Sequence, residues 1–385
     1  MDLRVCPELV YIRSVNTNTN GVSEMTTLTK ANDNWARRAP DERFASVQAL
    51  HEAALGYKAA ARRTRNVPVR QLEAKVSDDG AVVLNGSMVE TKLTNWSFGQ
   101  LAKEADAPAA YLSSLPAKLA ADCLNSGFSK SDASRELFYS LDNPTDSAGM
   151  RTLRAMTSGR YSRIWNSDIT RRLLQLEAEG PWQPAPAAFD GSRGLYLGDR
   201  DMFAFMVDND RRIFEKGPAG GLSRGFFVEN SEVGAASFKI MSFLYEFVCG
   251  NHRVWGVSEV KEVKIRHVGA ANTLAFDGLE AELIRYANSS ADETELQIER
   301  MRRYKLGKDL DEVIDRVMGL RVSGLGKKAI VDGFKVAEEY ADWYGDPKSS
   351  WGLAGGLTQV ARDMKNADDR VALERASAKV MEVAL

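Results

Sequence analysis

The spacing of apolar residues changes along the chain, and its first part has the patterns of helices and hairpins. Over residues 44–54 apolar positions recur every three or four residues, with acids before the run and arginines after it. This pattern predicts an amphipathic helix. Two β-rich stretches, 69–76 and 81–84, surround an Asp-Asp-Gly sequence at 78–80 that is typical of a hairpin turn.

Helix boundaries and a tail are also predicted in this part. Ser97 and Gln100 have the spacing of a helix capping box, and Pro108 and Pro116 predict breaks between short helices. The polar, Asn- and Thr-rich residues 1–34 show neither a helical nor a strand period. We expect them to form a flexible tail.

Strand-like runs follow one another from residue 135 to residue 255. Alternating apolar positions over 195–207 are interrupted at Gly198-Asp199, as expected of two strands joined by a turn. Alternation is weak over 224–255, which indicates a sheet that is buried on both faces. Period alone leaves open a buried helix over 237–248.

After about Gly269 the chain becomes helical in pattern and more acidic. Helices are expected at 276–287, 293–304, 309–318, 327–343 and 355–383. The sequence therefore predicts an α+β fold, with a central mixed or antiparallel sheet, an N-terminal mixed region and a helical C-terminal third. Beyond the tail we expect an N-terminal α/β region (35–145), a central β-rich domain (146–270) and a helical C-terminal region (271–385).

Composition excludes several classes of protein. The 385 residues include 51 Lys and Arg against 53 Asp and Glu, so the net charge of -2 excludes a wholly basic nucleic-acid binder. There is no apolar run long enough to span a membrane and no apolar leader at the start. Three widely spaced cysteines are typical of reduced thiols, so we expect a cytoplasmic protein without membrane contact.

Motifs for metal binding and nucleophilic catalysis are weak. Cys249, His252 and His267 lie near one another but lack a CxxC or HExxH spacing. Cys249 also ends an apolar run, where burial disfavours the reactive thiolate. The glycine–lysine sequence at 324–328 lacks the Walker spacing, although such a helix start can bind an anion. We therefore expect no catalytic residue, no metal and no cofactor.

Acidic side chains form the remaining catalytic alternative. Six of them lie near the ends of expected strands: Asp199, Asp201, Asp208, Asp210, Glu229 and Glu232. Their oxygens suit a divalent metal, whereas aspartates at strand ends also form turns. A metal-dependent nuclease or nucleotide-modifying enzyme is thus one alternative function.

The most informative signal is a basic segment, 151–172, with six arginines and one acid, Asp168. Tyr161 and Trp165 alternate with arginines there. Guanidinium groups bind phosphate oxygens and aromatic rings stack on unpaired bases, so the segment is typical of a nucleic-acid surface. Two further basic segments, Lys58–Lys75 and Arg253–His267, would extend it. For each segment a solvated charged face is the alternative.

Several stretches together resemble a family of phage- and plasmid-encoded proteins whose shared domain has no known function. The resemblance covers about residues 95–380 and rests on 98–125, 154–169, 194–208, 224–256, 263–272 and 349–383. It includes the Val-Cys-Gly-Asn sequence at 248–251 and the later Arg266-His267 pair. The chain departs from the family at 252–255, His-Arg-Val-Trp in place of threonine-leucine, and at 352–355, where asparagine-alanine is common.

This resemblance implies a role in phage or plasmid DNA metabolism, because such genes belong to mobile elements. A mixed sheet backed by helices is also broadly similar to the single-strand annealing proteins of phage recombination. We expect a non-catalytic homo-oligomer that binds single-stranded DNA during recombination, annealing or replication. The expected contacts are Arg151, Arg154, Arg160, Tyr161, Arg163, Trp165, Arg253, Lys261, Lys264, Arg266 and His267. A protein-binding module acting against host defence is a third alternative, which the near-neutral net charge favours.

Overall fold

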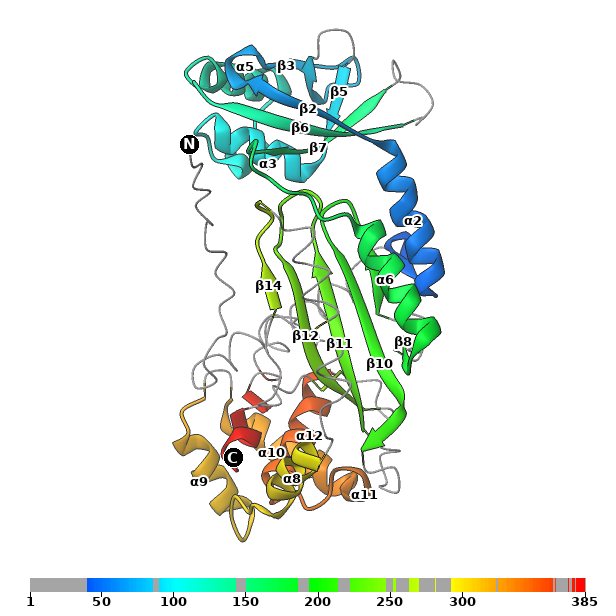
Figure 1. The fold of residues 1–385 in the computed structure, drawn as a ribbon. Helices are drawn as coiled ribbons and strands as arrows, with labels where there is room; N and C mark the ends of the chain where they lie inside the picture. The colour runs from blue at the N-terminus through cyan, green and yellow to red at the C-terminus, as the bar shows by residue number, and fades with distance from the viewer. Residues whose placement is uncertain are drawn as a thin grey trace, which may run out of the picture.

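Three parts follow one another along the molecule, a small sheet, a larger sheet and a group of helices (Figure 1). The computed structural model describes residues 40–384 with gaps at 86–89, 143–149, 186–193, 214–221, 247–251, 254–262, 270–280, 282–291, 323–324, 363, 365–372, 374–375 and 378. The expected tail, 1–34, lies outside these residues.

The first sheet is mixed and contains six of the described strands in the order β2-β6-β7-β5-β4-β3. Their bounds are β2 (Ala61–Pro68), β3 (Glu73–Val76), β4 (Val82–Asn85), β5 (Glu90–Leu93), β6 (Ser134–Leu141) and β7 (Arg151–Thr157). β5 and β7 are parallel, and the other pairs are antiparallel. The predicted hairpin is confirmed, because β3 and β4 pair across a turn in which Gly80 has a φ of 84°.

Three helices cover this sheet: α3 (Asn95–Glu104), α4 (Ala109–Leu112) and α5 (Ala117–Phe128). The helix breaks predicted at Pro108 and Pro116 are confirmed, because these residues immediately precede α4 and α5. The predicted capping box is wrong by one turn. Thr94 is the N-cap of α3, and its hydroxyl accepts a hydrogen bond from the Ser97 backbone N–H.

The second sheet is antiparallel, with the described strands in the order β1-β9-β10-β11-β12-β13 and with β8 and β14 paired to β10 and β12. The bounds are β1 (Arg43–Phe44), β8 (Trp182–Pro184), β9 (Leu195–Leu197), β10 (Met202–Ile213), β11 (Leu222–Asn230), β12 (Phe238–Glu246), β13 (His252–Arg253) and β14 (Val263–Ile265). Since β12 is a strand, the alternative of a buried helix over 237–248 is wrong.

Both faces of β11 are buried, as the weak alternation predicts for this part of the chain. Helices α2 (Val47–Ala60) and α6 (Asn166–Glu179) lie side by side along this sheet (Figure 1). They contribute Leu50 and Leu173 to a core shared with alternate residues of β10 and β11. The intervening positions of these strands carry stacked rings, of which Phe205 and Phe227 are 5.3 Å apart. Continuous burial along a strand therefore reflects two cores.

The described C-terminal helices complete an α+β fold, which confirms the predicted class. They are α8 (Asp292–Arg303), α9 (Leu310–Gly319), α10 (Lys327–Glu339), α11 (Ala341–Tyr344) and α12 (Ser350–Arg362). α10 and α12 approach closely at Gly333 and Gly356, where a Cβ on Gly356 would lie 1.9 Å from the Gly333 carbonyl oxygen. Of the helix expected at 276–287 only residue 281 is described. Within the described residues no helix is long and apolar enough to cross a membrane.

Two observations concern the expected region boundaries. The boundary at 145/146 falls between β6 and β7, which pair in one sheet. Helix α2 was expected in the N-terminal region, but it packs against α6 in the core of the second sheet. The reason is that strand pairing and helix packing join segments far apart in sequence, which local patterns do not report.

Candidate nucleic-acid interface

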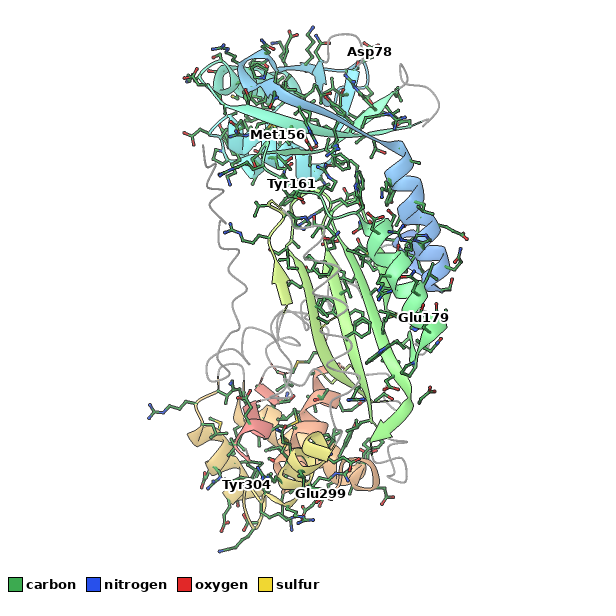
Figure 2. The ribbon with its side chains drawn as sticks, in the orientation of Figure 1. Asp78, Met156, Tyr161, Glu179, Glu299 and Tyr304 are labelled. Atoms are coloured by element: carbon green, nitrogen blue, oxygen red, sulfur yellow. The ribbon has the colours of Figure 1, made fainter. Side chains whose placement is uncertain are left out.

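The chain runs from the first sheet to the second through the predicted basic segment 151–172. It comprises β7, a loop over 158–165 and the start of α6. Figure 2 shows Met156 at the first sheet and Tyr161 next to it, toward the second sheet. The segment therefore has one end in each sheet, and its side chains meet residues of both.

Arg154 is buried at a bulge in β7. Phe138 pairs with Ala155 and Tyr139 with Leu153, so Arg154 has no opposite residue and is turned out of the ladder. Its guanidinium lies 3.3 Å from the Glu232 carboxylate and donates to the Asp199 carbonyl. The Arg154 and Glu232 side chains are only 6% and 1% exposed. Arg154 is thus held inside the molecule by the carboxylate of Glu232, which lies in the loop between β11 and β12 of the second sheet.

Arg163 is the second buried arginine. Its Nη1 lies 3.1 Å from Glu136 Oε1, its Nε donates to the Glu232 carbonyl at 2.7 Å, and its guanidinium lies 3.7 Å from the Phe138 ring centre. Burial lowers the pKa of Arg163, and the hydrogen bond that Arg163 donates to Glu136 opposes this change. We name Glu136, Arg154, Arg163 and Glu232 the ionic junction.

The ionic junction is neutral, with two arginines and two glutamates. Burying any one of these charges without a partner would cost several kcal/mol. Glu232 also accepts a hydrogen bond from the backbone N–H of Asn166, at the start of α6. Its negative charge therefore lies where the helix dipole favours it and replaces a side-chain cap, which Trp165 does not supply.

Tyr161 and His267 form a stacked pair beside the junction. Their ring centres are 5.1 Å apart and the planes differ by 8°. Tyr161 donates to the Ser231 carbonyl, and His267 Nδ1 donates to the Ser162 carbonyl. Burial raises the pKa of Tyr161 and lowers that of His267 to about 4. Both rings are therefore neutral near pH 7, and each stacks on the other and hydrogen-bonds to a backbone carbonyl.

Trp165 is half-buried, and protein groups surround its ring. It packs edge-on against Phe138 with 6.0 Å between ring centres, and Lys58 Nζ lies 5.3 Å from its ring centre. Lys58 in turn pairs with Asp168 at 3.0 Å. Stacking of a base on this ring would have to displace Lys58, so we leave Trp165 out of the proposed surface, together with Arg154 and Arg163.

The other expected contacts are scattered. Arg151 donates to the Thr91 hydroxyl and lies over the Tyr139 ring. Arg160 and Arg266 are exposed, and within the described residues no hydrogen bond or ion pair engages either side chain. Arg253 and Lys264 lie in β13 and β14, and Lys261 lies outside the described residues. The structure thus gathers the buried members of the set and leaves Arg160 and Arg266 in solvent.

A more exposed basic surface lies on β2, which we name the basic edge and define by Arg62, Arg63 and Arg65. β2 is an edge strand of the first sheet, and positions 62–66 are exposed in succession. Arg62 donates to the carbonyls of Ala59 and Ala61, at the end of α2. Within the described part of the chain no hydrogen bond or ion pair engages the Arg63 side chain. These arginines belong to the second basic segment, but the sequence analysis did not name them as binding residues. The signal that could have identified them is the run of three arginines without an acid over 62–65.

Three of the six carboxylates of the enzymatic alternative are paired with cations. Asp208 lies 3.6 Å from Arg224, Glu229 lies 2.5 Å from Lys239, and Glu232 belongs to the ionic junction. Among the residues that the structure describes, no group of three or more His, Cys, Asp or Glu side chains is placed to hold a metal ion. Cys249 lies outside the described residues.

Fold and site together define an α+β protein in which a neutral ionic junction joins two sheets and an arginine-rich edge strand faces solvent. The model of a family described as a domain of unknown function (DUF932) matches residues 155–360, and the chain belongs to this family. No curated protein and no solved structure matches the chain. The matched span includes Arg163 and Glu232, whereas β2 and Glu136 precede it.

Proposed function

We propose that this protein binds single-stranded DNA along the basic edge, and that the ionic junction fixes the sheet that carries this edge. The observation that supports the proposal is the run of exposed positions over 62–66, which contains three arginines and no acid. Exposed guanidinium groups bind phosphate oxygens through charge-assisted hydrogen bonds. Displaced counterions then add to the affinity.

Aromatic stacking is the second part of the proposed contact. Tyr57 lies in the last turn of α2, which leads directly into β2. The residue is 37% exposed, and the Arg154 guanidinium lies over its ring, 5.1 Å from the ring centre. An unpaired base would therefore stack on the part of this ring that Arg154 leaves exposed. A flexible single strand can follow one line of charges, whereas a duplex keeps its bases stacked inside. We therefore favour single strands over duplex.

The resemblance to phage- and plasmid-encoded proteins extends the proposal to recombination, annealing or replication of such DNA. A site of a few arginines is small, so we include self-association in the proposal. Several copies on one strand would multiply the affinity of each site without new contacts.

The experiment is a titration of the full chain against a fluorescein-labelled oligothymidine and against a duplex of equal length, followed by anisotropy over a range of salt concentrations. We expect log affinity for the single strand to fall linearly with log salt. The same titration with magnesium, followed by electrophoresis of the oligonucleotide, tests the nuclease alternative. Cleavage would contradict a purely binding role.

A double variant tests the location of the site. Arg63→Ala with Arg65→Ala should weaken binding and make the salt slope shallower by about 1.4, because each phosphate contact on a single strand contributes about 0.7. The matched control is Arg303→Ala with Lys308→Ala, which removes two side chains that are 80% and 89% exposed, at the end of α8 and in the turn before α9. Absence of binding at low salt, or equal losses in the two double variants, would overturn the proposal.

A further inference from the structure

Two neighbouring arginines of the basic edge differ in their partners. Arg65 Nε lies 3.2 Å from Glu136 Oε2, although the Arg65 side chain is 66% exposed. Arg63 is on the same strand, and among the described residues no hydrogen bond or ion pair engages its side chain. A phosphate that reaches Arg63 meets a guanidinium that none of the described residues engages, whereas at Arg65 it meets one that already holds a carboxylate.

A bulge in β2 brings Arg65 within reach of Glu136. Thr64 pairs with Leu137 and Val67 with Arg135, so that Arg65 and Asn66 both lie opposite Glu136. Asn66 has a φ of 57°, the left-handed conformation that such a bulge uses. The extra residue allows the Arg65 side chain to reach the buried carboxylate from the solvent side.

The two oxygens of Glu136 serve different arginines. Oε1 lies 3.1 Å from Arg163 Nη1 inside the ionic junction, and Oε2 faces Arg65 at the rim. The Glu136 side chain is 4% exposed, so it needs a cation to remain charged there. If Arg65 leaves, Arg163 still neutralises Glu136. Arg65 is therefore the member of this group that can be exchanged without leaving a buried charge unpaired.

We propose that Glu136 occupies the phosphate position at Arg65 before DNA binds, so that binding exchanges this carboxylate for a backbone phosphate. The inference rests on the proposed function and adds an internal competitor to it. Glu136 lowers the affinity of the basic edge and makes Arg63 its principal anchor. Because the Arg65 side chain is mostly exposed, the competition amounts to about two- to fivefold in the dissociation constant.

The experiment is a double-mutant cycle on affinity for the labelled oligothymidine, with Glu136→Gln combined with Arg63→Ala or Arg65→Ala. Glu136→Gln should bind about two- to fivefold more tightly than wild type, because it removes the competing charge. Arg63→Ala should cost more affinity than Arg65→Ala in the wild-type background. With Gln at position 136, the cost of Arg65→Ala should rise by the same factor and that of Arg63→Ala should stay the same.

Glu104→Gln is the matched control. It removes a carboxylate at the end of α3, a helix that covers the same sheet, where Glu104 pairs with Arg135 at 2.9 Å instead of with Arg65. Its affinity should stay closer to wild type than that of Glu136→Gln. Thermal melting of each variant verifies folding, and the comparison of Arg63→Ala with Arg65→Ala needs no change in the buried glutamate.

The outcomes separate the two proposals. If Arg63→Ala with Arg65→Ala binds as wild type does, the proposed function is wrong. If binding depends on the basic edge but Arg63→Ala and Arg65→Ala cost the same, or the cycle shows no coupling between Arg65 and Glu136, only the internal competitor is wrong.

Discussion

The arginines of the ionic junction are buried, whereas those of the basic edge are exposed. The Arg163 side chain is 1% exposed and the Arg65 side chain is 66% exposed, yet both reach the carboxylate of Glu136. In the junction each arginine has a carboxylate partner and a ring beside it. On the edge Arg63 extends into solvent. Burial and neutralisation, rather than arginine content, distinguish a structural cluster from a binding surface.

This difference changes how a basic segment is interpreted. A buried guanidinium must be paired, so its charge contributes little to the field outside the protein. An exposed guanidinium keeps its charge available to a phosphate. The segment with the larger number of arginines, 151–172, is therefore the weaker candidate for binding, and the shorter run on β2 is the stronger one.

The largest expected change in the free energy of unfolding comes from removing one arginine of the ionic junction. Arg163→Met keeps an apolar side chain but leaves Glu136 without its buried partner, which should lower the free energy of unfolding by about 3–5 kcal/mol. Arg160→Ala, three residues earlier and exposed, is the matched control and should change stability by less than about 0.5 kcal/mol. Urea unfolding followed by circular dichroism measures both. Equal effects would show that Arg163 is not structurally important.

The next effect is a pH dependence that arises from His267. Burial lowers the pKa of His267 from 6.5 to about 4, so the unfolded chain takes up a proton at a higher pH than the folded one. Stability attributable to this group is complete above pH 6.5 and is lost as the pH falls toward 4, by about 3 kcal/mol. The stability of His267→Gln should therefore fall less than that of wild type over this range. His51→Gln is the control, and parallel curves for wild type and His267→Gln would contradict the assignment.

The smallest expected effect on stability concerns Arg63, the exposed counterpart of the buried junction arginines. Arg63→Ala should change the free energy of unfolding by less than about 0.5 kcal/mol, because its side chain is exposed and unengaged by the described residues. The same variant should still weaken binding of the labelled oligothymidine. A clear loss of stability with unchanged binding would place Arg63 with the structural arginines.

Elements with a local cause could be predicted from the sequence. The Asp-Asp-Gly turn joins β3 and β4, the prolines at 108 and 116 precede helices, and the weakly alternating residues form buried strands. Thr94 was missed as the cap of α3 because two overlapping spacings fit, and only the observed hydrogen bonds distinguish them.

The candidate site depended on contacts that a local pattern does not contain. Glu232 caps α6 and neutralises Arg154 from a position 66 and 78 residues further along the chain. Nothing in the residues near Arg154 or Arg163 reports these partners. Without them, arginines and aromatics at short spacing predict an open surface, although the structure packs them between two sheets.

The most direct test of whether DNA binds along β2, and not along the segment 151–172, is hydrogen exchange of the full chain with and without saturating oligothymidine. The outward N–H groups of an edge strand exchange readily unless something covers them. We expect DNA to slow exchange in β2 and at the end of α2, and to leave the loop over 158–165 and the residues around Glu232 unchanged. Slowed exchange centred on 154–165, with β2 unaffected, would contradict it.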